Sequence, residues 1–151
     1  MISEKIKLLH NEMAGLQLAA DHLAYSLERC QTLIGLPTLQ PDELERLESM
    51  TARFARLADL LIQRIFRLVD DIELVSHGSV LDRIYRAEKR GWANATEMIR
   101  IRELRNLIAH EYATEQMSEI YATVASMAPF LQTVVQQVSA YVDSALINPS
   151  A

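Results

Sequence analysis

Residues 41–72, PDELERLESMTARFARLADLLIQRIFRLVDDI, set the architecture that the sequence predicts for this chain. Pro41 suits the first turn of a helix, and the carboxylates of Asp42 and Glu43 favour a helix N-terminus. Apolar side chains then recur at steps of three and four, the spacing of one helix face, namely Leu44, Leu47, Met50, Phe54, Leu57, Leu61, Ile65, Leu68 and Ile72. We therefore expect one amphipathic helix of about 30 residues, roughly 45–50 Å long.

The residues before this stretch predict another helix of similar length. From Ile2 to about Ile34 the apolar residues again follow the helical period, namely Ile6, Leu9, Met13, Leu16, Ala20, Leu23 and Leu27. Gly35 and Pro37 then end the helix, since glycine and proline are common just beyond a helix C-terminus. Two long antiparallel helices are expected to frame the fold.

A third, shorter helix is expected after the break at residues 76–79. Ser79 can cap its first turn, with Asp82 in the third position of a capping box, where Glu or Gln is more usual. Gly91 closes this helix.

The last segment predicts a further long helix, from about Thr114 to Ile147, because its apolar residues also follow the helical period. Pro129 lies inside it, and a proline in a helix interior predicts a kink or a break, here near Met127. No stretch alternates apolar and polar residues as a strand would. The sequence thus predicts an all-α, up-and-down bundle of about five helices that forms one domain over residues 1–151.

The polar side chains that are candidates for a site are concentrated in the helix between Gly91 and Thr114. Asn94 and Glu97 form a second capping box and open it, and we expect it to end between His110 and Tyr112. Its last part reads Leu104-Arg105-Asn106-Leu107-Ile108-Ala109-His110-Glu111-Tyr112. The remainder of this helix follows an apolar period, so these polar residues are the strongest candidates for a site.

The geometry of a helix constrains how these side chains can act together. Arg105 projects at the margin of the apolar sector, where a core residue would be expected, and a buried unpaired charge is costly. Asn106 and His110 are one turn apart and share a stripe with Arg102. Arg105 and His110 lie about 140° apart around the helix axis, so the two side chains cannot easily contact one small group together. Either the helix frays before His110, or a second copy completes the site.

The carboxylates at the end of the long second helix offer two interpretations. Asp70, Asp71 and Glu73 form a solvated helix face by default. Alternatively, one of them pairs with Arg105.

The stretch Arg105-Asn106-Leu107-Ile108-Ala109-His110 resembles the signature of the HEPN superfamily, an arginine, a polar residue, three further residues and a histidine. The continuation His110-Glu111-Tyr112 is similar to the HepT-like branch, in which the histidine is followed by any residue and then tyrosine. Residues 86–92 also look like the segment that leads into this motif. The resemblance covers roughly residues 80–113, whereas the first two helices match only in length and character.

The resemblance implies a ribonuclease toxin of a toxin–antitoxin pair, active as a homodimer with a composite site formed by Arg105, Asn106 and His110. It also implies that a small nucleotidyltransferase antitoxin transfers AMP to Tyr112. The residue types suit such chemistry without a metal or other cofactor. Histidine can move protons near neutral pH, and arginine can stabilise charge on phosphorus.

The charge distribution is consistent with an RNA substrate such as tRNA or mRNA. The chain has a formal net charge of −5, which disfavours indiscriminate nucleic-acid binding. Residues 82–105 nevertheless contain seven basic and four acidic residues. This local excess of +3 suits a phosphate-bearing partner at Arg102, although a solvated basic helix face is the alternative.

Two other functions stay open from the sequence. One is a non-catalytic HEPN adaptor, or substrate-binding subunit, for a nucleotidyltransferase. The other is a structural helical dimer whose polar residues form a buried network. The N-terminus lacks a basic region followed by an apolar run, and no stretch is long and apolar enough to span a bilayer, so we expect a cytoplasmic protein without a membrane partner.

Overall fold

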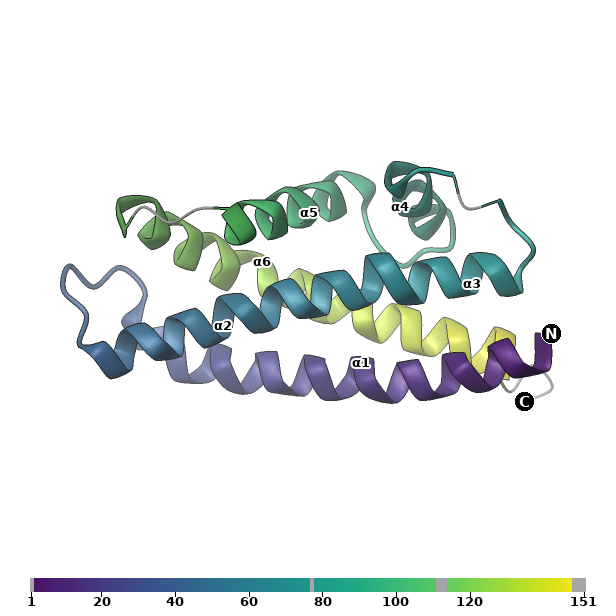
Figure 1. Cartoon of the computed structure of the whole chain (residues 1–151), viewed down its shortest axis with the longest axis horizontal. Coiled ribbons are helices and arrows are strands. Elements are labelled where there is room, and N and C mark those ends of the chain that lie inside the picture. The colour runs from purple at the N-terminus through teal and green to yellow at the C-terminus, as the bar shows by residue number, and fades with distance from the viewer. Residues whose placement is uncertain (1, 77, 111–113, 148–151) are drawn as a thin grey trace.

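The computed structural model describes residues 2–76, 78–110 and 114–147, and these residues form a bundle of helices without a strand (Figure 1). In chain order the elements are α1 (Ile2–Cys30), the 3-10 turn η1 (Gln31–Leu33), α2 (Pro41–Asp59), the π-helical turn η2 (Leu60–Ile65), α3 (Phe66–Ile72), α4 (Val80–Lys89), α5 (Ala95–His110), α6 (Thr114–Tyr141) and the π-helical turn η3 (Val142–Ile147). The predicted all-α bundle is confirmed.

The two long helices lie side by side and antiparallel, as the sequence predicts. α1 runs along most of the molecule, and α2, η2 and α3 follow one another as a single long rod beside it (Figure 1). The rod begins with Pro41 in its first turn, and the side chain of Glu43 accepts a hydrogen bond from the backbone N–H of Gln40 at 2.8 Å. The sequence did not predict the π turn in the middle of this rod.

The predicted capping residues begin α4 and α5. The Ser79 hydroxyl accepts from the Asp82 backbone N–H at 3.1 Å, and the Asp82 carboxylate accepts from the Ser79 backbone N–H at 2.8 Å. Gly91 follows α4 with a φ of +82°, a conformation that side chains with a Cβ disfavour. The Asn94 side chain accepts from the backbone N–H of Glu97 at 3.0 Å at the start of α5.

α6 continues through Pro129 without a break. Of the kink or break predicted near Met127, the break is therefore wrong. Proline removes one main-chain hydrogen bond, but the packing of the helix compensates on both sides, because Ala128 and Leu131 are buried completely while Pro129 itself is exposed.

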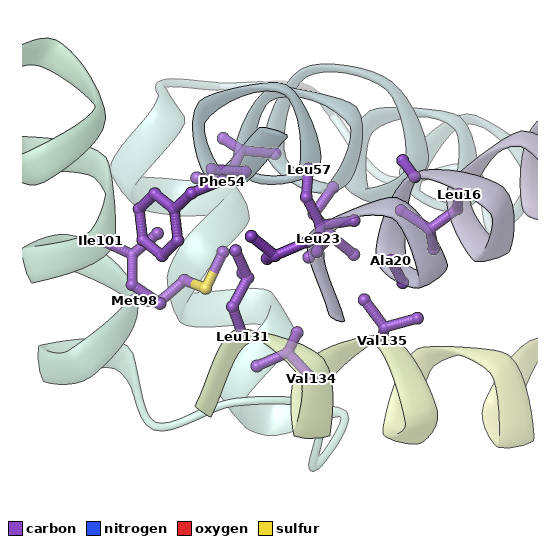
Figure 2. Close-up of a cluster of buried hydrophobic side chains, with 14 of the residues drawn as sticks. Leu16, Ala20, Leu23, Phe54, Leu57, Met98, Ile101, Leu131, Val134 and Val135 are labelled. Carbon is purple, nitrogen blue, oxygen red and sulfur yellow. The ribbon is translucent and has the colours of Figure 1, made fainter. Parts of the chain in front are cut away.

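A continuous apolar core joins the helices. Side chains of α1, α2, α5 and α6 converge in it, as Figure 2 shows for Leu23, Phe54, Met98 and Leu131. Each fully buried leucine or phenylalanine stabilises the fold by about 1.5–3 kcal/mol. This core holds α5 against α2 and so fixes the two walls of the candidate site described below.

An ionic network ties α3 to α4. Asp70 is fully buried, and its carboxylate lies 2.6 Å from Arg86 and 2.9 Å from Arg90. The Arg90 guanidinium also lies 2.8 Å from Glu73 and stacks over the ring of Trp92, 5.0 Å from its centroid. A solvated face is thus wrong for Asp70, and neither Asp70 nor Glu73 is the partner of Arg105. The helical period alone does not show that α4 crosses over this end of the rod.

Candidate functional site

A pocket of about 630 Å³ lies between the α2–η2 segment and α5. Three of the sequence-predicted site residues on α5, Arg102, Arg105 and Asn106, line it. The opposite wall consists of residues that the sequence analysis did not single out, with the polar side chains of Arg56, Asp59, Gln63 and Arg64 beside Leu60 and Ile62. The lining is therefore polar on both sides, although the helices beneath it pack through apolar faces.

Positive charge dominates this pocket, since four arginines line it with one carboxylate. Neither Arg56 nor Arg102 forms an ion pair with any side chain that the structure describes. The Arg64 guanidinium lies 3.6 Å from Glu12 on α1. Guanidinium groups present planar sets of N–H donors that match phosphate oxygens, so the pocket suits an anionic, phosphate-bearing ligand.

Arg105 is held by Asp59. Its Nε donates to one carboxylate oxygen at 2.7 Å and its Nη2 donates to the other at 2.9 Å. Both side chains are partly exposed, at 35% and 42%. These hydrogen bonds raise the pKa of Arg105 above its usual value. The fork-like pairing fixes the plane of the guanidinium, and its third nitrogen, Nη1, has no hydrogen bond to a described residue.

The acidic partner of Arg105 thus comes from the middle of the long rod and not from its end. Asp59 is 46 residues away from Arg105 in sequence. It is the last residue of α2, directly before the π turn η2. Because a π turn inserts an extra residue, it changes which side chains face a given direction, and such turns are often found at functional sites. Here the turn contributes Gln63 and Arg64 to the pocket.

His110 does not line the pocket. α5 continues to His110. The predicted alternative in which the helix frays before His110 and so brings it to Arg105 is therefore wrong. The stripe of Arg102, Asn106 and His110 faces solvent, because Asn106 and His110 are exposed and Arg102 is only partly buried. The helix turns this stripe away from the core that Met98 and the other buried residues of α5 occupy. Tyr112 lies outside the described residues.

The predicted basic strip over residues 82–105 is only partly correct. Arg83 is buried, and Arg86 and Arg90 serve the ionic network around Asp70. These three cations are directed into the protein because α4 packs across the end of the long rod. The positive charge beside Arg105 comes from Arg102, which does belong to the predicted strip, and from Arg56 on α2 and Arg64 on η2.

The helical pattern gave little indication of the residues on α2 and η2. Arg56, Asp59, Gln63 and Arg64 fall on the polar side of an amphipathic helix, where charged residues are ordinary. One signal was present, since the run Leu60-Leu61-Ile62 is wider than one apolar stripe. A run of this kind indicates that other helices pack against more than one face of the rod.

Comparison with known proteins leaves the site to be interpreted on its own geometry. No family model, no curated protein and no solved structure matches this chain. Among the described residues, none of the helices combines the length and the apolar character needed to cross a membrane. Nor does any group of three or more His, Cys, Asp or Glu side chains within that part of the chain lie where it could hold a metal ion.

Proposed function

We propose that this protein is a metal-independent endoribonuclease whose site combines the arginine-rich pocket with His110. The observation that carries the proposal is that four arginines and Asn106 line one pocket. One wall of this pocket is α5, the helix that bears the Arg-x4-His motif. A phosphodiester backbone supplies the anionic oxygens that such a pocket favours. The resemblance to HEPN ribonucleases supports the same reaction.

The proposed reaction assigns a separate task to each polar residue. His110 takes the proton from a 2′-hydroxyl or delivers one to the leaving oxygen, because an imidazole nitrogen can act as a general base or a general acid. Arg105 stabilises the additional negative charge on the pentacoordinate phosphorus through the N–H groups that Asp59 leaves free. Asn106 holds a phosphate oxygen or orients the imidazole.

The proposal requires a twofold dimer, because His110 does not line the pocket that contains Arg105 and lies about 140° away from it around α5. The solvent-facing side of α5 supports contact with a second copy. Asn106, Leu107 and His110 are all exposed on it. Asn106 and Leu107 each precede His110 by about one helix turn, and Leu107 is an apolar side chain with 44% exposure. A symmetric contact along this side would bring two arginines and two histidines towards one cleft.

We further propose that the protein is a toxin controlled by a small nucleotidyltransferase that adds AMP to Tyr112. The support is sequence similarity around His110-Glu111-Tyr112. AMP would place a phosphodiester charge and a bulky adenosine two residues from His110. Such an adduct would repel RNA phosphates and obstruct the approach to the histidine.

The test compares Arg105→Ala and His110→Ala with the wild type on bulk RNA and tRNA in excess chelator. Each variant is expected to lose about 10²- to 10⁴-fold in cleavage rate while keeping its helical circular dichroism spectrum. Arg100→Ala is the matched control, because Arg100 is a 64% exposed arginine of the same helix that does not line the pocket. Equal cleavage by all four proteins would eliminate the proposed site.

One observation favours a second candidate, a non-catalytic adaptor that binds a nucleotidyltransferase or its nucleotide. His110 lies outside the pocket, so the pocket alone can bind an anion without performing acid–base chemistry. Under this alternative, the wild type binds nucleotides or the partner but does not cleave RNA. Binding that survives His110→Ala but not Arg105→Ala would favour the adaptor.

A further inference from the structure

Arg83 is a buried cation without a carboxylate partner among the described residues. Arg83 lies on α4 and is only 8% exposed. Nη1 donates to the backbone carbonyl of Ile62 at 3.3 Å and to Oε1 of Gln63 at 3.2 Å. Nε is buried without a hydrogen-bond partner. A buried charge with only neutral acceptors is costly, so we expect Arg83 to have a function beyond filling space.

The location of these acceptors indicates what the function is. Ile62 and Gln63 both belong to the π turn η2, and both line the arginine-rich pocket. Where a π turn returns to α-helix, one carbonyl loses its main-chain donor, and Arg83 supplies a donor to the Ile62 carbonyl. Arg83 therefore supports the pocket wall from behind, without lining the pocket itself.

The hydrogen bond to Gln63 fixes the orientation of its carboxamide. A guanidinium has only N–H donors, so the Gln63 atom that faces Arg83 must be the carbonyl oxygen. The NH₂ group is then the end of the carboxamide that remains for the pocket. With the oxygen engaged by a cation, the amide is also polarised, which strengthens its N–H groups as donors.

We infer that Gln63 contacts the ligand by donating from its NH₂ group to an anionic phosphate oxygen, and that Arg83 is the positioning residue that aims it. The identification of the ligand as RNA rests on the proposed function, whereas the preference for an anion rests on the pocket itself. Gln63 thus completes the wall opposite Arg102 with a neutral donor.

Gln63→Glu separates this role from a structural one. The new carboxylate can pair with Arg83, so stability against urea should be unchanged or higher. The same change removes the donor and adds negative charge, so affinity for a phosphate ligand should fall about tenfold or more. Gln137→Glu is the control, since it makes the same charge change at an exposed position of α6. Gln63→Ala, which removes the donor without adding charge, should lose less affinity than Gln63→Glu.

The probes are inorganic pyrophosphate and a short 2′-O-methyl RNA, which cannot be cleaved through its 2′-oxygen. Weaker binding by Gln63→Glu, with Gln137→Glu unchanged, supports the inference even if the wild type cleaves no RNA and the proposed reaction is wrong. Binding by Gln63→Glu as tight as that of the wild type overturns the inference even if RNA is cleaved. A wild type that binds neither probe overturns it as well.

A double-mutant cycle tests the positioning role of Arg83. Arg83→Met should weaken binding of the 2′-O-methyl RNA in the wild-type background but have little further effect in Gln63→Ala, because the group that it orients is already absent. Arg83→Lys, which keeps one cationic donor, should retain part of the affinity. An equal loss from Arg83→Met in both backgrounds would mean that Arg83 acts only through the fold.

Discussion

Replacing Asp70 with asparagine is expected to destabilise the protein far more than the same change at Asp59, although both carboxylates bind arginine. Asp70 is fully buried and faces two guanidinium groups, those of Arg86 at 2.6 Å and Arg90 at 2.9 Å. Its neutralisation leaves two cations around a buried amide, and breaking a buried pair in this way costs about 3–5 kcal/mol. For a chain of this size, that corresponds to a fall in melting temperature of roughly 6–20 °C.

Asp59 behaves differently because water reaches both partners. Its side chain is 42% exposed and that of Arg105 is 35% exposed, so solvent screens the pair. Asp59→Asn should therefore cost less than about 1 kcal/mol in the free energy of unfolding. Its main effect should be on cleavage, through the lost orientation of Arg105.

Urea unfolding of both variants, followed by circular dichroism at a helical wavelength, provides the measurement. Asn keeps the size of the side chain in each case, so the two substitutions form a matched pair that differs in burial. Equal losses at the two positions would contradict the reasoning, as would a larger loss at Asp59.

Three further outcomes are expected. Arg102→Ala should weaken RNA binding for all sequences and reduce the slope of log affinity against log salt concentration by about one, because a phosphate contact is lost. A salt titration with 2′-O-methyl RNA measures this slope, and an unchanged slope would contradict the contact. The hydrogen bonds from Ser79 lower the pKa of Asp82, so the ionised carboxylate should stabilise the fold above about pH 4, and this contribution should be lost as the pH falls through the lowered pKa. The wild type should therefore have a higher free energy of unfolding than Asp82→Asn at pH 7, and the difference between the two proteins should disappear towards pH 2. A difference that grows in acid would contradict this prediction. Tyr112→Phe should remain folded and active but escape inactivation by the nucleotidyltransferase, and mass spectrometry of co-expressed protein should find AMP on Tyr112; neutralised protein without this adduct would indicate inhibition by docking.

Features that depend on local sequence were predictable. The helical period located the long rod that begins at Pro41, and the capping residues Ser79 and Asn94 located the starts of α4 and α5. These signals act within a few residues of one another, so the sequence contains them directly. Pro129 shows the limit of this approach, because packing with distant helices overrides its local preference to interrupt α6.

The candidate site was only partly predictable because its two walls are distant in sequence. Arg105 and Asn106 could be selected as polar residues on an apolar helix, and both line the pocket. The choice of Asp59 over Asp70 as partner of Arg105 depends on where α5 crosses the rod. Gln63 gains its role from the π turn and from Arg83 on another helix, and no spacing in the sequence indicates either contact.

The composite dimeric site is tested by a heterodimer of one Arg105→Ala chain and one His110→Ala chain, purified through two different tags. Each homodimer should be inactive on RNA. The heterodimer contains one complete pair of Arg105 from one chain and His110 from the other, so it should recover up to about half of the wild-type activity. A heterodimer that forms but stays as inactive as the two homodimers would contradict a site shared between chains.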